Sequence, residues 1–179
     1  RADLVDPARI VLVGHSEGGM TVPILAAELE GVAAAVLLAA PARTVAELSC
    51  EQFVALKRQQ GVEGEELASY EARVRDVFAR IEEGAEIAAE DLPGELAMLL
   101  AVRPWLASHA LVDPLANIAR VRCPVLLLHG ERDIQVSAER DARPLAAALD
   151  AACHPDHDLV VLEGHDHLIK STNGETSSG

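Results

Sequence analysis

One stretch decides how the rest of the chain is interpreted: Ile10-Val11-Leu12-Val13-Gly14-His15-Ser16-Glu17-Gly18-Gly19. An apolar run without alternation is typical of a parallel strand buried on both faces, so we expect a strand over residues 10–13. The Gly-x-Ser-x-Gly pattern that follows is typical of a strained turn that carries a serine between a strand and a helix. We expect Gly14 and Gly18 to be required, because a Cβ atom there would collide with the neighbouring strand or helix.

Ser16 is the candidate nucleophile of this turn. The amides that begin the next helix, expected over residues 18–29, favour negative charge, so the serine would lie beside a site that stabilises an oxyanion. The alternative is a tight Gly-rich turn without chemistry, because the pattern arises by chance in roughly one chain in twenty of this length. The apolar run before the turn and the helix after it favour the nucleophile.

Composition indicates a globular protein and narrows its partners. The chain has 179 residues, 50% of them hydrophobic, which is enough for one domain with a sizeable core. A net charge of −14 with only 15 basic residues argues against nucleic acid or an anionic membrane surface as partner. The longest apolar run, residues 32–40, is about half of what a membrane span needs.

Targeting and redox signals are sparse. Residues 1–3 lack the pattern of a secretory leader, and any leader would lie upstream of Arg1, so the compartment stays open with the cytoplasm as the default.

Three cysteines, Cys50, Cys123 and Cys153, are odd in number and far apart. That distribution favours small core residues over a disulfide framework or a thiol site.

Further apolar runs predict the rest of a sheet. We expect a second strand over residues 36–39, which with the first strand and helix makes a right-handed parallel crossover unit. The strand signal returns over residues 125–128 and 159–162, with a helix containing Pro144 between them. The predicted fold class is therefore α/β, with a mostly parallel sheet of about four strands and flanking helices.

Residues 44–120 carry a helical pattern without a strand signal. Thr44-Val45-Ala46-Glu47 is a capping box, and apolar spacing predicts helices up to Gly61, over 65–83 and over 94–102. We expect a helical insertion that acts as a lid, or alternatively helices that simply pack on one sheet face. Residues 1–43 and 121–170 would form the core, and residues 171–179 a polar tail.

Chemistry-bearing residues follow three of the predicted strands. In an open parallel sheet, functional groups gather beyond the carboxyl ends of the strands, where this chain carries Ser16, Asp133 and the pair His165 and His167. A serine hydroxyl needs a general base, and that base needs an orienting carboxylate. The order serine, acid, histidine is the one that α/β-hydrolases use.

Several assignments stay open at this point. His165 competes with His167 because the two are two residues apart, and Glu131 competes with Asp133 because it lies closer to the strand end. His15 and His129 are interpreted as supporting or core histidines. Histidines and aspartates around residues 154–158 and 164–167 have zinc-ligand chemistry. The strand between these clusters separates them by roughly 13 Å, so we expect no shared metal.

The sequence resembles the α/β-hydrolase family, most closely bacterial esterases and peptidase-like hydrolases with a helical lid between the sixth and seventh strands. The resemblance covers most of residues 5–170, and the matching pieces are residues 14–19, 113–114, 124–136 and 167–170. Family members show Gly-x-x-His-Leu at the last of these. The resemblance implies Ser16 as nucleophile, Asp133 as acid and His167 as base. The backbone amide of Glu17 would supply one half of the oxyanion hole.

The resemblance also implies an eight-stranded sheet, and this chain begins just before the expected fifth strand. The loop that would supply the second oxyanion donor is not in the sequence, and losing one such donor costs about 10²–10³ in turnover. We therefore expect a C-terminal portion of a longer protein, or a chain that needs a partner to complete its sheet. Activity of this chain alone is not expected.

The function predicted from these observations is that of a carboxylesterase-like serine hydrolase. It would cleave small carboxylic esters through a Ser-His-Asp triad and an acyl-enzyme, with no cofactor and no metal. Its partner would be a small ester or amide substrate, with no nucleic acid and no membrane span. The alternatives are a peptidase or thioesterase on the same triad, or an inactive hydrolase-like module that acts only in binding.

Overall fold

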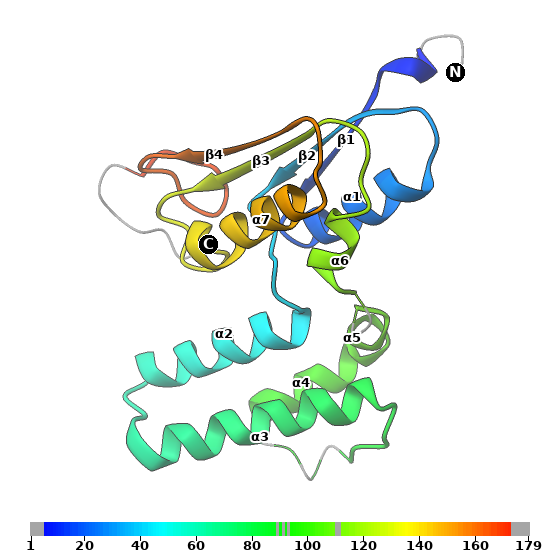
Figure 1. Cartoon of the computed structure of the whole chain (residues 1–179). Coiled ribbons are helices and arrows are strands. Elements are labelled where there is room, and N and C mark those ends of the chain that lie inside the picture. Colours follow the sequence, from blue (N-terminus) through cyan, green and yellow to red (C-terminus); the bar gives the residue numbers. More distant parts are fainter. Residues whose placement is uncertain (1–5, 89, 91, 93, 110–111, 173–179) are drawn as a thin grey trace. The chain divides into compact units, whose positions relative to one another are not determined.

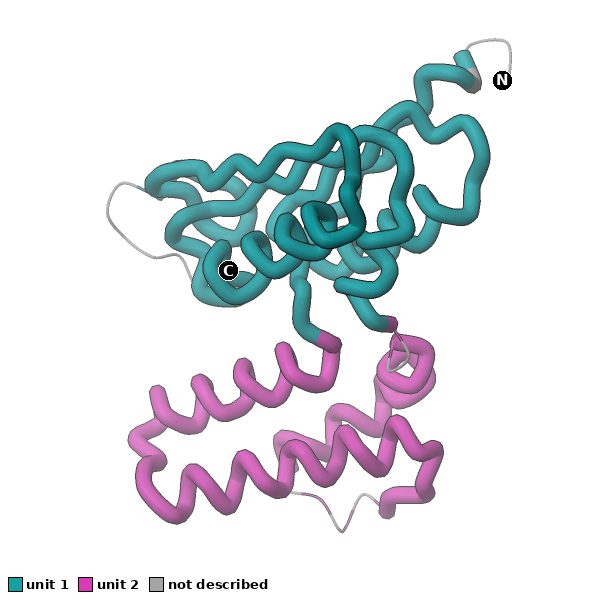
Figure 2. Tube along the Cα trace, viewed as in Figure 1, with its two compact units in different colours: residues 1–43, 113–179 teal, residues 44–112 magenta. Residues whose placement is uncertain are grey.

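The computed structural model describes residues 6–88, 90, 92, 94–109 and 112–172. The chain divides into two compact units, residues 1–43 with 113–179 and residues 44–112 (Figure 2). Of the expected polar tail, residues 173–179 lie outside the described part of the chain. Among the described residues, no helix combines the length and apolarity that a membrane crossing requires.

The first unit contains the predicted sheet. Its four strands follow the order β1 (Ile10–His15), β2 (Val32–Leu38), β3 (Val125–Gly130) and β4 (His157–Leu162) (Figure 1). Every neighbouring pair is parallel, which confirms the predicted fold class. Leu38 lies opposite both His15 and Leu128, so the carboxyl ends of β1, β2 and β3 meet at one edge of the sheet.

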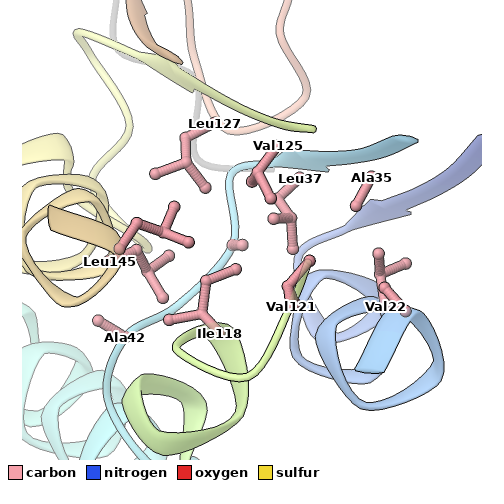
Figure 3. Close-up of a cluster of buried hydrophobic side chains, with 12 residues drawn as sticks. Val22, Ala35, Leu37, Ala42, Ile118, Val121, Val125, Leu127 and Leu145 are labelled. Atoms are coloured by element: carbon pink, nitrogen blue, oxygen red, sulfur yellow. The ribbon is translucent and has the colours of Figure 1, made fainter. Parts of the chain in front are cut away.

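Three helices of this unit, α1 (Glu17–Glu28), α6 (Pro114–Ile118) and α7 (Arg143–Ala151), lie on one face of the sheet (Figure 1). Leu37 of β2 and Leu127 of β3 are fully buried beneath them (Figure 3). Ile118 of α6 and Leu145 of α7 belong to the same buried cluster. Burying a side chain of this size contributes about 1.5–3 kcal/mol, so this layer fixes the strands on which the candidate site is built.

The helix expected between β3 and β4 is present but irregular at its start. A π-helical turn, η4 (Ala138–Ala142), comes first, and α7 begins at Arg143. Pro144 lies in the first turn of α7, directly after this π-helical turn, and its missing N–H cannot donate a backbone hydrogen bond there. Periodicity could not reveal this boundary, because the apolar spacing continues across both helices.

Helix α6 was not predicted from the sequence. The side chain of Asp113 caps it by accepting a hydrogen bond from the amide of Ala116 (3.0 Å), and Pro114 occupies its first turn. Because α6 packs against α1 and α7, residues 113–120 belong to the unit that contains the sheet.

The described part of the second unit contains the helices α2 (Val45–Gln59), α3 (Gly64–Glu82), α4 (Gly94–Ala101) and α5 (Arg103–His109), joined by turns and loops. The capping box at α2 is present: the Thr44 hydroxyl accepts from the Glu47 amide (3.2 Å), and a Glu47 carboxylate oxygen accepts from the Thr44 amide (2.9 Å). The helix expected over residues 94–102 is α4, and Pro104 lies in the first turn of the next helix, α5.

The three cysteines are free thiols that differ in burial. Cys50 is buried and Cys123 packs half-buried against the core, but Cys153 is exposed. The expectation of a core residue is therefore wrong for Cys153, which follows the end of α7 with a φ of 54°.

Candidate active site

Ser16 occupies the turn between β1 and α1. Its φ of 54° and ψ of −117° are unusual for a residue with a side chain, and such strain costs about 1–3 kcal/mol. The amide of Ser16 donates to the carbonyl of Leu38 (2.9 Å), and the amide of Gly19 donates to the carbonyl of Ser16 (2.8 Å). These bonds hold the strained residue at the carboxyl edge of the sheet.

The glycines of this turn have different roles. A Cβ atom on Gly14 would overlap the carbonyl of Gly18, and one on Gly19 would come within 2.9 Å of the Ala40 Cα. A Cβ atom on Gly18 would meet nothing within 4 Å, so the expectation for Gly18 was wrong. Gly19 is required instead, because it lets α1 approach the segment that follows β2.

His167 lies between Ser16 and Asp133. Its Nε2 is 3.1 Å from the Ser16 Oγ, and its Nδ1 is 2.8 Å from the Asp133 Oδ2. Asp133 is 5% exposed and His167 is 7% exposed, so the carboxylate and the imidazole interact away from bulk water. Because the carboxylate can only accept, Nδ1 carries the proton, and Nε2 is left to accept the hydrogen of the serine hydroxyl.

The second oxygen of Asp133 is held by the backbone. The amides of Gln135 and Val136 both donate to Asp133 Oδ1, each at 2.9 Å. Such bonds to a carboxylate are about twice as strong as bonds between neutral groups. With both oxygens bound, the carboxylate is fixed in one orientation.

The loop that carries His167 is shaped by Asp166. This carboxylate is 2% exposed, and its Oδ1 accepts from the amides of Leu168 (2.9 Å) and Lys170 (3.0 Å). The loop is also bound to the one that carries Asp133, since the amide of Arg132 donates to the carbonyl of His165 (2.8 Å). The two loops after β3 and β4 therefore hold each other.

The competing residues have other partners. The Nδ1 of His165 donates to the carbonyl of Glu163 (2.8 Å), and the Oε2 of Glu131 accepts from the amide of Gly164 (2.9 Å). The structure thus brings together Ser16, His167 and Asp133, whereas His165 and Glu131 bind loop backbone. Glu17, the expected oxyanion donor, is the first residue of α1 and directly follows Ser16.

His15 supports His167 from β1. Its Nε2 donates to the backbone carbonyl of His167 (2.8 Å), and the two ring centroids are 4.9 Å apart. His15 is exposed, so it is not a core histidine. Among the described residues, no group of three or more His, Cys, Asp or Glu side chains could hold a metal ion.

His129 lies at the end of β3 and is fully buried. Its Nε2 donates to the carbonyl of Ala40 (3.0 Å), while its Nδ1 has no hydrogen-bond partner within the described part of the chain. Burial lowers the pKa of His129 below its ordinary value of 6.5, because the charged imidazole would lose its hydration. The neutral ring is the form that the fold contains.

Stability should therefore fall in mildly acidic solution. Because the pKa of His129 is lower in the folded chain than the ordinary value of 6.5, the unfolded chain protonates this histidine first as pH falls, and the unfolded state then binds more protons than the folded state. One such group lowers the free energy of unfolding by at most about 1.4 kcal/mol per pH unit, and the loss ends once the pH passes below the folded-state pKa. Urea denaturation at pH 7.5 and 5.5 should show a smaller loss for His129→Gln than for wild type. A His165→Gln control should behave like wild type, and equal losses in all three proteins would contradict the assignment.

The chain matches the sequence profile of the alpha/beta hydrolase family over residues 1–171. It belongs to the alpha/beta hydrolase family. No curated protein matches this chain in sequence.

Solved structures agree with the family. This member of the alpha/beta hydrolase family is similar to a puromycin-hydrolyzing peptidase of Mycobacterium tuberculosis, with 20% identity and a TM-score of 0.53, over 93% of this chain and 20% of that one. An esterase of Pyrococcus furiosus is 18% identical with a TM-score of 0.53, over 90% of this chain and 46% of that one. Dipeptidyl peptidase 4 of Porphyromonas gingivalis is 19% identical with a TM-score of 0.51, over 94% of this chain and 18% of that one. At these identities the likeness shows the α/β-hydrolase fold, and the chain spans less than half the length of each of the three.

Proposed function

We propose that the protein containing this chain is a serine hydrolase that cleaves small carboxylic esters through an acyl-enzyme. The observation that carries the proposal is the hydrogen-bonded series Ser16 Oγ, His167 Nε2, His167 Nδ1 and Asp133 Oδ2, with links of 3.1 and 2.8 Å. A hydroxyl, an imidazole and a buried carboxylate in this order supply a nucleophile, a general base and the group that orients the base.

In the first half of the reaction, the Ser16 Oγ attacks the ester carbonyl carbon while His167 Nε2 takes the hydroxyl proton. The tetrahedral intermediate then expels the alcohol, to which His167 returns the proton. In the second half, water loses a proton to His167 Nε2 and attacks the acyl carbonyl carbon. The second tetrahedral intermediate then breaks its bond to the Ser16 Oγ, which takes the proton back from His167 as the acid is released. Asp133 holds the Nδ1–H tautomer and stabilises the imidazolium, and the Glu17 amide donates to the developing oxyanion.

An ester is the proposed substrate class for a chemical reason. An ester carbonyl is less stabilised by resonance than an amide carbonyl, and its alcohol leaves more readily, so ester cleavage demands the least additional machinery. A net charge of −14 disfavours a strongly anionic substrate such as an acyl-CoA thioester. Peptidase chemistry on the same residues is the alternative, since solved structures of this fold include both esterases and peptidases.

The helical unit of residues 44–112 is inserted between β2 and β3 in the chain. We propose that it acts as a lid over the active site, because an insertion between two strands of the sheet is where such a lid would be expected.

Covalent labelling tests the nucleophile directly. A fluorophosphonate probe, added to the full-length protein, should phosphonylate one serine, and mass spectrometry of the digest should find the adduct on the peptide that contains Ser16. Labelling should disappear after prior incubation with p-nitrophenyl acetate at concentrations that keep the acyl-enzyme populated. A folded protein that takes no label, or takes it elsewhere, would leave hydrolysis through Ser16 without support and favour a binding module.

A further inference from the structure

A buried ion pair lies behind the candidate active site. Asp141 of η4 is fully buried, and the side chain of Arg43, which follows β2, is 13% exposed. The Arg43 Nε donates to Asp141 Oδ1 (2.9 Å) and Nη2 donates to Oδ2 (2.6 Å). This two-pronged contact fixes both side chains, because the guanidinium and the carboxylate match each other in shape.

The pair ties η4 to the segment that supports the nucleophile. Asp141 Oδ1 also accepts from the amide of Ala42 (3.1 Å), so the carboxylate binds two successive residues after β2. In the same segment, Ala40 packs against Gly19 of α1 directly behind the serine turn. A shift of Asp141 would therefore also displace the segment that packs against the turn carrying Ser16.

One peptide group connects the ion pair to Asp133. Arg43 Nη2 donates to the carbonyl of Gln135 (3.4 Å), and that carbonyl shares its peptide group with the amide of Val136. The Val136 amide donates to Asp133 Oδ1 (2.9 Å). A cation at the carbonyl oxygen polarises the peptide and strengthens its N–H as a donor, because hydrogen bonds in series reinforce one another.

A purely structural role would explain the ion pair less completely. Buried ion pairs add little net stability compared with apolar residues of similar volume, so stability alone gives weak reason for one here. Asp141 also lies in a π-helical turn, an irregularity that is frequent at functional sites. The contact to Gln135 links the pair to a carboxylate that already binds His167.

We propose that Arg43 and Asp141 are positioning residues of the active site, which hold Asp133 in the orientation that binds His167. The inference rests on the proposed serine hydrolase function. Loosening Asp133 lowers the fraction of molecules in which His167 is aligned with Ser16. It leaves the surface that binds the substrate unchanged, so the loss should appear in kcat and not in KM.

The test replaces both charges at once. The double variant Arg43→Gln/Asp141→Asn keeps polar side chains of similar size and leaves no uncompensated buried charge. In the full-length protein, kcat for p-nitrophenyl acetate should fall by about 10- to 100-fold, the loss typical of a small misplacement of catalytic groups. KM should stay within about twofold of wild type. The low-field NMR resonance of the His167 Nδ1 proton should broaden or move, because this proton lies in the bond to Asp133.

A matched pair serves as control. Arg143 and Glu139 form an exposed ion pair of 2.6 Å on the neighbouring turns, and the variant Arg143→Gln/Glu139→Gln should keep the wild-type kcat and resonance. If the first double variant does not fold, Arg43→Lys takes its place, because lysine keeps the charge but lacks the two-pronged geometry. A folded variant with a lower melting temperature but wild-type kcat and resonance would overturn the proposal. Wild-type protein without Ser16-dependent hydrolysis would instead refute the proposed function, and the resonance would still test the positioning of Asp133.

Discussion

Ser16→Ala is expected to lower kcat for p-nitrophenyl acetate in the full-length protein by a factor of about 10⁴ or more. The variant removes the oxygen that lies 3.1 Å from His167 Nε2, so no acyl-enzyme can form. The remaining rate would come from water attack on substrate that is still bound near the N-terminus of α1. Alanine has the same backbone requirements as serine at a φ of 54°, so the free energy of unfolding should change little.

Steady-state kinetics with purified variants measure this loss, and circular dichroism verifies the fold. Ser69→Ala is the matched control, because Ser69 is an exposed serine on α3. It should keep the wild-type rate and the fluorophosphonate label, both of which Ser16→Ala should lose. A Ser16→Ala protein that retains more than a few per cent of the wild-type rate would refute the proposed nucleophile.

Asp133→Asn is expected to lower kcat by about 10⁴ without unfolding the protein. The asparagine oxygen can still accept from the amides of Gln135 and Val136, which leaves its NH₂ group facing His167 Nδ1. Two donors cannot share that contact, so the imidazole must adopt the tautomer protonated at Nε2. In that form Nε2 can no longer accept the proton of Ser16.

Glu131→Gln is the control for this variant, because Glu131 is the other acid in the same loop. A glutamine oxygen can still accept from the amide of Gly164, so the loop and the rate should change little. NMR with ¹⁵N-labelled histidine reports the tautomer of His167 independently of the rate. Equal activities for the two variants, or a larger loss in Glu131→Gln, would exclude Asp133 as the orienting carboxylate.

The burial on both faces that we expected for residues 10–13 is wrong, because Val13 of β1 is 61% exposed. The strands were nevertheless predictable, because a parallel strand is typically apolar at nearly every position. The runs at residues 125–128 and 159–162 satisfy that requirement, and both are strands in the structure. Their ends were not predictable from hydropathy. β4 begins at His157 because pairing with Val125 of β3 extends the strand into polar residues.

Short helices escaped the sequence analysis for a related reason. α6 has five residues, too few for apolar periodicity to register, and only its cap at Asp113 and Pro114 marks it. The π-helical form of η4 was not predicted either, because its five residues lie within one continuous helical segment.

By itself, the sequence determined the fold class, the serine turn and the chain order in which a serine, an acid and a histidine follow successive strands. These properties are local, because each depends on the residue pattern within one element or on the order of elements along the chain. Only the tertiary structure decided that His167 and Asp133, and not His165 and Glu131, lie together beside Ser16. It also decided that Gly19 faces Ala40 and that Arg43 meets Asp141. Side chains in loops take their direction from hydrogen bonds between segments distant in sequence, and those bonds exist only once the sheet has assembled.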